Sequence, residues 1–326
     1  MNHFFPQPAD AQEAALFDRI TQWQGGPANL SAFTPDFIRD LTAREGCDFA
    51  TALLHRRIVT SEEHGPFLRE RLGRGSLAPA PGLLLGIVPG AFYRENPRTG
   101  ADGRLALEAA AQLGLPAEVI PTSSTGRLAE NAEIIATWLL ARQERSCALV
   151  SVSKGSSDLK AAFARPDANR IFRRTVAWIN LCGILDGTPM ADWLFSPGWL
   201  ARANRFVYRI RGHSLDFLED LRRFPGCPLD FPLILPHGLR AIHVLGFPLK
   251  RHLYNGLVRR CHTRVEAYGP NDGSIILADA LRWPGQLCPV WAADHHLRPP
   301  GGARPLLEAI FKAVCSVSDS GPSQDK

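Results

Sequence analysis

The stretch LVSVSKGSSD at residues 149–158 decides how this chain is organised. An apolar run leads into Ser153, small residues stand two positions before and after it, and a helical pattern follows at once. This order is typical of a strand, a sharp turn and a helix. The backbone of such a turn passes close to itself, so it needs small neighbours, and Ser151 and Gly155 meet that need. The turn would lift the Ser153 hydroxyl off a sheet end beside a helix N-terminus. Ser153 is therefore a candidate nucleophile, and the alternative is a Ser- and Gly-rich loop without chemistry.

Strand-like and helix-like segments alternate on both sides of this turn. The helical patterns cover residues 105–113, 129–142, 158–164, 250–262 and 306–314. On the helix of residues 250–262 we expect His252 and His262 to lie on a solvated face among basic residues. Such alternation predicts an α/β fold, with a mostly parallel sheet covered by helices on both faces. The expected strands are residues 83–88, 117–121, 147–150, 176–183, 241–246 and 287–291.

Three segments stand apart from this alternation. Residues 1–76 carry apolar positions at helical spacing and predict a helical N-terminal extension, joined by a Gly- and Pro-rich linker to a main domain of residues 77–316. Residues 184–240 are rich in aromatic side chains, and we interpret them as a cap above the strand ends, the alternative being a satellite core. Residues 317–326 are polar and predict a disordered tail.

Composition narrows the class of protein. The 326 residues carry a net charge of +5, and their basic residues are scattered, without a stripe interleaved with aromatics, so we expect no nucleic-acid partner. The 7 cysteines are dispersed and form no CxxC pair, which is typical of thiols in a reducing compartment. The absence of a signal-like N-terminus and of a membrane-length apolar run predicts a cytoplasmic protein without stable membrane insertion. No His, Cys or Asp pairs recur at ligand spacing, so we expect neither metal nor cofactor. The sequence leaves open whether the chain forms a homo-oligomer.

A serine nucleophile needs a base, and the base needs an orienting group. Both should lie at strand ends, on the sheet edge that carries Ser153. Two later loops offer them: YGPNDGS at residues 268–274 contains Asp272, and WAADHH at residues 291–296 contains His295 and His296. Asp272 could instead be a simple turn former, because Asn, Asp and Gly favour turns. Asp186, near the end of the fourth expected strand, is an alternative acid.

The turn and the order Ser, Asp, His resemble the α/β-hydrolase superfamily, in particular its lipase-like and esterase-like members. The sequence SVSKG at residues 151–155 resembles the G-x-S-x-G elbow, with Ser151 in place of the first glycine. The resemblance covers residues 83–314 and leaves out the first 76. It implies that Ser153 is the nucleophile, Asp272 the orienting acid and His295 the general base, with His296 as the alternative base.

The resemblance also implies an oxyanion hole. Its first part would be the loop PGAF at residues 89–92, where many members of the superfamily have His-Gly and this chain has Pro89. Backbone N–H groups of Ala91 and Lys154 would then bind the oxyanion.

The expected function is that of a serine hydrolase acting on a carboxylic ester or thioester through an acyl-enzyme. The apolar content of the 184–240 insertion suggests a small-molecule substrate with an apolar acyl or alkyl group. An acyltransferase on the same acyl-enzyme and a non-catalytic binding protein of the same fold are the alternatives.

Overall fold

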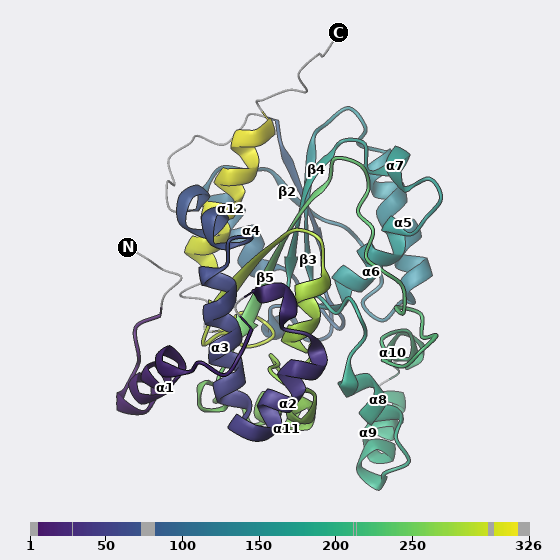
Figure 1. Cartoon of the computed structure of the whole chain (residues 1–326). Coiled ribbons are helices and arrows are strands. Elements are labelled where there is room, and N and C mark those ends of the chain that lie inside the picture. Colours follow the sequence, from purple (N-terminus) through teal and green to yellow (C-terminus); the bar gives the residue numbers. More distant parts are fainter. Residues whose placement is uncertain are drawn as a thin grey trace.

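The computed structural model describes residues 6–27, 29–72, 82–210, 212, 214–298 and 303–318. Its centre is one six-stranded sheet with the order β2-β1-β3-β4-β5-β6, in which every neighbouring pair of strands is parallel (Figure 1). This arrangement confirms the predicted parallel α/β fold. The strands are β1 (Leu84–Val88), β2 (Ala117–Val119), β3 (Cys147–Val152), β4 (Thr175–Leu181), β5 (Arg240–Phe247) and β6 (Gln286–Trp291).

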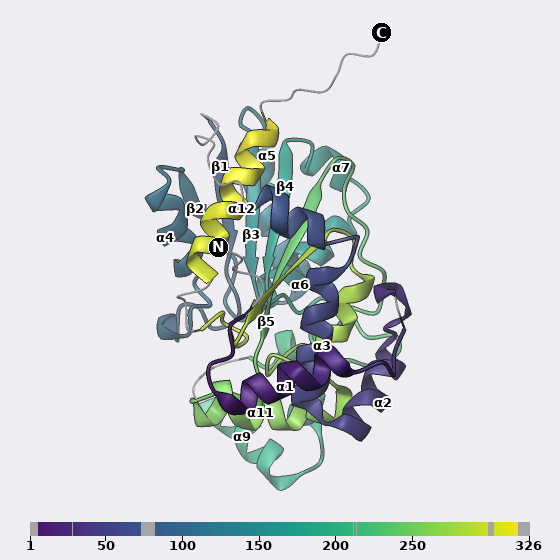
Figure 2. The same ribbon diagram turned by 60° about the vertical axis from the view of Figure 1, so that its left-hand side comes forward.

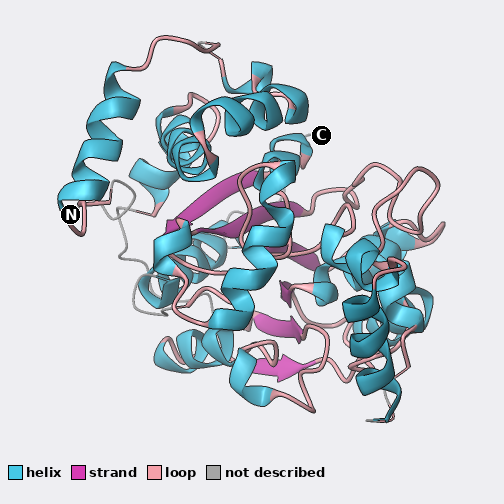
Figure 3. Cartoon of the chain, turned by 90° about the horizontal axis from the view of Figure 1, so that it is seen from below, coloured by secondary structure: helices cyan, strands magenta, loops and turns pink. Residues whose placement is uncertain are grey.

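Helices cover both faces of the sheet, as Figure 3 shows from below. Successive residues of a strand point to opposite faces, and in β3 Leu149 belongs to one buried apolar cluster while Val150 belongs to the other. The first cluster includes residues of α5 and α6, and the second includes residues of α4 and α12. Both faces of the sheet are therefore core. The helices are α4 (Arg104–Gln112), α5 (Leu128–Leu140), α6 (Lys154–Phe163), α7 (Ala168–Ile171) and α12 (Ala303–Ser318).

The N-terminal segment is helical and packs against the β5–β6 side of the sheet. Its second helix begins at Pro35, where the Thr34 hydroxyl accepts a hydrogen bond from the Phe37 N–H and caps the helix. On the third helix His55 is buried, with its ring centroid 5.5 Å from that of Phe247 and 5.1 Å from that of Trp291. The elements are α1 (Ala11–Gln22), η1 (Leu30–Ala32), α2 (Pro35–Glu45), α3 (Cys47–Thr60) and the π-helix η2 (Phe67–Arg71).

Between β4 and β5 the described residues form three helices, which lie toward the lower end of the molecule in Figure 1. They occupy the segment in which we expected a cap. The other short elements follow β1 and β5. We keep the name cap for the segment of residues 184–240. Its helices are α8 (Pro189–Phe195), α9 (Trp199–Ile210) and α10 (Asp216–Asp220); the other elements are η3 (Pro97–Thr99), η4 (Lys250–His252), α11 (Gly256–Val265), η5 (Glu266–Tyr268) and η6 (Leu277–Arg282).

Two predictions about local structure were wrong. The predicted helix of residues 250–262 is broken, because the Asn255 side chain accepts from the Leu257 N–H and caps a new helix, α11. This start places His262 in the core, where it is buried and not solvated as expected. The predicted tail also begins too early, because α12 runs through Val317 to Ser318.

Two further predictions concern segments that the structure does not describe. The linker before β1 and the tail after Ser318 lie outside the described residues. No helix among the described residues is long and apolar enough to cross a membrane.

Candidate active site

Ser153 occupies a strained turn between β3 and α6. Its φ is 51° and its ψ is −117°, a conformation that non-glycine residues rarely adopt and that costs on the order of 1–3 kcal/mol. Three backbone hydrogen bonds hold it there: the Ser153 N–H donates to Leu181 O, and Ser153 O accepts from Ser156 and Ile184. The surrounding structure therefore fixes the hydroxyl at the N-terminus of α6.

Gly155 explains why the turn needs a residue without a side chain. A Cβ atom at this position would lie 2.4 Å from Val88 O and 2.6 Å from Pro89 O. The helix after Ser153 thus passes directly against the end of β1 and the start of the 89–92 loop.

The structure brings Ser153, His295 and Asp272 into one hydrogen-bonded chain. His295 Nε2 lies 2.8 Å from Ser153 Oγ, and His295 Nδ1 lies 2.8 Å from Asp272 Oδ2. Ser153 follows β3, Asp272 follows β5 and His295 follows β6, so the three residues meet at the carboxyl edge of the parallel sheet. This is the geometry in which an imidazole removes a hydroxyl proton and a carboxylate holds the imidazole tautomer.

The pKa values of the two adjacent histidines shift in opposite directions. Burial lowers the pKa of His295, but the Asp272 carboxylate outweighs burial and raises that pKa above its ordinary value. Burial and the neighbouring His295 and Arg298 lower the pKa of His296 to about 3. Among the described residues, the buried His296 Nδ1 has no hydrogen-bond partner. His295, and not the alternative His296, contacts Ser153.

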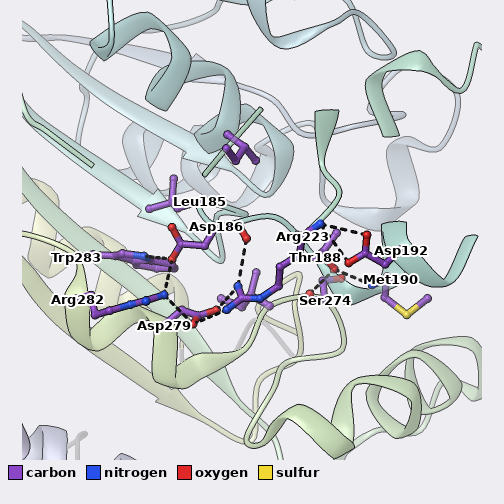
Figure 4. A network of polar contacts seen from close by, with 12 residues as sticks. Leu185, Asp186, Thr188, Met190, Asp192, Arg223, Ser274, Asp279, Arg282 and Trp283 are labelled. Carbon is purple, nitrogen blue, oxygen red and sulfur yellow. Dashed lines mark hydrogen bonds and ion pairs between the residues drawn. The ribbon is translucent and has the colours of Figure 1, made fainter. Parts of the chain in front are cut away.

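Asp272 is held by its own loop. Its Oδ1 accepts from the Ser274 and Ile275 N–H groups at 2.9 Å, while Oδ2 is left for His295. The Thr188 hydroxyl donates to Ser274 O at 2.5 Å and so ties this loop to the start of the cap (Figure 4). Both oxygens of the carboxylate are therefore committed.

The alternative acid, Asp186, has other partners. Figure 4 shows it beside Trp283, whose Nε1–H donates to Asp186 Oδ2 at 2.9 Å. Arg223 belongs to the same network of polar contacts and forms two hydrogen bonds with Asp279, at 2.6 and 2.9 Å. This network joins the cap to η6.

The 89–92 loop lies beside the turn. A Cβ on Gly90 would stand 3.3 Å from Ser153 Cβ and 3.0 Å from Val152 O. Within the described part of the chain, the N–H groups of Ala91 and Lys154 donate no hydrogen bond. Both N–H groups are thus free to donate to a group bound beside Ser153.

Comparison with known proteins gives matches in structure alone. No protein-family model and no curated protein matches the chain by sequence. A metagenomic carboxyl esterase has a TM-score of 0.58 and 20% identity over 92% of this chain and 98% of its own. A mature lipase of Bacillus licheniformis follows, with a TM-score of 0.48 and 19% identity over 68% of this chain and 87% of its own. A phospholipase of Legionella pneumophila has a TM-score of 0.48 and 12% identity over 71% of this chain and 60% of its own.

This chain has the α/β-hydrolase fold. The predicted resemblance is thereby confirmed for the fold, which is built on the parallel sheet described above.

In this α/β-hydrolase fold, a buried ion pair lies next to the turn. Lys154 Nζ is 2.7 Å from Asp158 Oδ1, and both side chains are about 1% exposed. Asn131 also donates to Asp158, at 2.9 Å. Burial raises the pKa of Asp158 to about 6, against the opposing charge of Lys154. The pair fixes the residue whose N–H is a candidate oxyanion donor.

Sequence reasoning missed a chain of polar groups beneath the turn. Trp178 Nε1–H donates to Ser151 Oγ at 2.7 Å, Ser151 Oγ lies 2.7 Å from Ser156 Oγ, and Ser156 donates to Asn180 Oδ1 at 2.8 Å. Asn180 Nδ2 in turn lies 2.9 Å from His243 Nδ1. The substitution of Ser151 for the usual first glycine therefore has a structural role. The available signal was a set of polar residues inside otherwise apolar strands.

The described residues contain no group of three or more His, Cys, Asp or Glu side chains placed to hold a metal ion.

Proposed function

We propose that this protein is a serine hydrolase that cleaves a carboxylic ester or thioester through an acyl-enzyme. The observation that carries the proposal is the unbroken Ser153–His295–Asp272 hydrogen-bond chain, with both contacts at 2.8 Å. The non-catalytic alternative predicts a histidine out of reach of Ser153, which is not what the geometry offers.

In the acylation step, Ser153 Oγ attacks the carbonyl carbon and its proton passes to His295 Nε2. The Asp272 carboxylate stabilises the imidazolium, and the N–H groups of Ala91 and Lys154 bind the oxyanion. Collapse of the tetrahedral intermediate breaks the bond to the alcohol or thiol, which leaves with the proton from His295.

In the deacylation step, His295 accepts a proton from water as the water oxygen attacks the acyl carbon. The second tetrahedral intermediate collapses, Ser153 recovers its proton from His295, and a carboxylic acid is released.

Aromatic side chains beside the 89–92 loop support a substrate with an apolar acyl or alkyl group. The Phe92 ring lies 5.5 Å from that of Tyr208 and 5.3 Å from that of Phe217, and the two partners come from the cap. The metagenomic carboxyl esterase of the same fold is in keeping with ester cleavage. The partner of the site is then a small ester or thioester.

The test is hydrolysis of p-nitrophenyl esters of increasing acyl length, and of an acyl thioester, by the wild type and Ser153→Ala. We expect Ser153→Ala to lower kcat by about 10³-fold or more, with binding retained. Ser31→Ala, at an exposed serine far along the chain from the turn, is the control and should retain full activity. Equal rates for Ser153→Ala and the wild type would reject the proposal.

A further inference from the structure

The outer face of α9 is apolar and exposed. Trp199 is 79% exposed, Phe206 64% and Ile210 68%. They recur at intervals of seven and four residues, which places them on one stripe of the helix. Ala201 is buried on the opposite side. Burial of the inner side leaves this stripe without cover from the described residues of the chain.

Cations flank the apolar stripe. Arg202 and Arg209 are exposed on α9. Residues 199–215 contain no Asp or Glu, and neither do residues 250–265. Two segments of the chain are therefore basic and entirely free of acidic residues.

The second basic segment belongs to the same end of the molecule. Helix α8 contacts both α9 and α11, and the Arg264 guanidinium of α11 lies 4.2 Å from the Trp193 ring centroid of α8. Figures 1 and 2 both place α9 and α11 at the lower end of the protein. Exposed Leu257 and Tyr254 add apolar surface there. We call the exposed residues of these two helices and of Tyr254, at this end of the molecule, the α9–α11 face.

A groove on α11 adds a place for an anionic group. Its volume is 500 Å³, and its lining includes Lys250, Arg259, Arg260 and Arg264. Lys250 is paired with Glu266, whereas Arg259 and Arg260 are exposed. An acid-free groove of this kind suits a phosphate-bearing headgroup better than a neutral one.

We propose that the α9–α11 face docks on an anionic lipid surface. Apolar side chains flanked by arginines match the acyl boundary and the negative headgroups of such a surface. A second copy of this chain fits less well, because a symmetric contact would bring two acid-free, arginine-rich faces together.

The proposal has a consequence for the candidate site. Tyr208, on α9, stacks on Phe92, which follows the candidate oxyanion residue Ala91. A lipid surface held against the outer face of α9 would therefore lie across that helix from Phe92. The docking itself does not depend on the hydrolase activity.

The test is co-sedimentation of the full chain with vesicles of phosphatidylcholine alone, or mixed with phosphatidylglycerol. The wild type should bind the mixed vesicles at least about tenfold more tightly, and added salt should weaken that binding. Arg202→Glu with Arg209→Glu, and separately Phe206→Ser with Ile210→Ser, should each lower the partition coefficient about tenfold or more. Arg44→Glu and Ile234→Ser are exposed controls outside the face and should bind as the wild type does.

Three results would overturn the proposal. The first is no binding of the wild type to mixed vesicles, and the second is equal binding by the face variants and the controls. The third is a wild-type dimer, seen by light scattering, that becomes a monomer in the Phe206→Ser, Ile210→Ser variant. That result would assign the face to a second copy of the chain. All substituted side chains are exposed, so each variant should retain the fold. Urea unfolding of each variant checks this.

Discussion

At the scale of single residues, Asp272 divides its two oxygens between structure and chemistry. Oδ1 is used by the N–H groups of Ser274 and Ile275, and Oδ2 faces His295. Replacing the carboxylate by an amide leaves the loop hydrogen bonds possible but removes the charge beside the imidazole. The consequence should appear in the pH dependence of the reaction.

We predict that Asp272→Asn lowers kcat/KM by about 10³- to 10⁴-fold and moves the acid limb of its pH profile to lower pH. The base works only when His295 is neutral, so activity is lost as the pH falls through a pKa that Asp272 holds above its ordinary value. Without that charge, burial alone acts on His295 and its pKa falls.

The measurement is kcat/KM for a p-nitrophenyl ester from acidic to neutral pH. Asp186→Asn is the matched control, because Asp186 faces Trp283 and not His295, and its acid limb should stay in place. An unchanged limb in Asp272→Asn would contradict the assigned role of the acid.

At the scale of elements, the turn between β3 and α6 depends on close packing against β1. Val88 O is fixed because β1 pairs with strands on both sides, β2 and β3. A Cβ on Gly155 would come within 2.4 Å of that oxygen. Either the helix or the strand must then move.

We predict that Gly155→Ala lowers the free energy of unfolding by about 2–3 kcal/mol. Gly256→Ala is its control, because a Cβ there meets nothing within 4 Å and alanine favours a helix. Urea denaturation of both variants measures the difference. A Gly155→Ala protein as stable as the control would show that the turn is not packed as described.

The polar chain beneath the turn yields a second prediction at this scale. Ser151→Ala leaves the Trp178 indole N–H without its acceptor and should cost about 1–3 kcal/mol of stability. Adding Trp178→Phe removes the donor as well, so the double variant should lose less than the sum of the two single losses. Strict additivity in a double-mutant cycle by urea unfolding would argue that the contact contributes nothing.

Local patterns predicted the strands because apolar runs bounded by Gly and Pro need little tertiary information. They also singled out Ser153, Asp272 and His295, which the fold brings together, although their roles stay predictions. The burial of His262 was missed because it depends on where α11 begins. The Asn255 cap that sets this start was visible in the sequence but was outweighed by the basic character of the helix. Contacts such as Trp178 to Ser151 join separate strands, so no local pattern contains them.

At the scale of the whole molecule, burial shifts the pKa values of several titratable side chains. Burial lowers the pKa of His55 to about 3 and that of His243 to about 4. Burial together with the neighbouring His295 and Arg298 lowers that of His296 to about 3. Burial also lowers the pKa values of His64, His252 and His262. Burial acts in the opposite sense on Asp158, whose pKa rises to about 6. Unfolding in mild acid therefore takes up protons on this larger set of histidines and releases one from the aspartate.

We predict that stability falls as the pH drops from about 6.5 toward 4, by about 1.4 kcal/mol per pH unit for each proton taken up in net. Folding lowers the pKa of each of these histidines. The resulting stabilisation is present above the histidine pKa of the unfolded chain and is lost as the pH falls from that value toward the folded pKa. Urea unfolding at several pH values measures the slope, and His237→Gln, at an exposed histidine, should leave it unchanged. A flat or inverted dependence over this range would contradict the buried, neutral state of these histidines.

The central claim is that Ser153 is a nucleophile activated by His295. Reaction of the folded protein with a fluorophosphonate, followed by peptide mapping, tests it most directly. The account predicts a covalent adduct on Ser153 that is lost in Ser153→Ala and strongly slowed in His295→Ala, with a known serine esterase labelled in parallel. An unlabelled Ser153 in folded protein, beside a labelled reference enzyme, would contradict it.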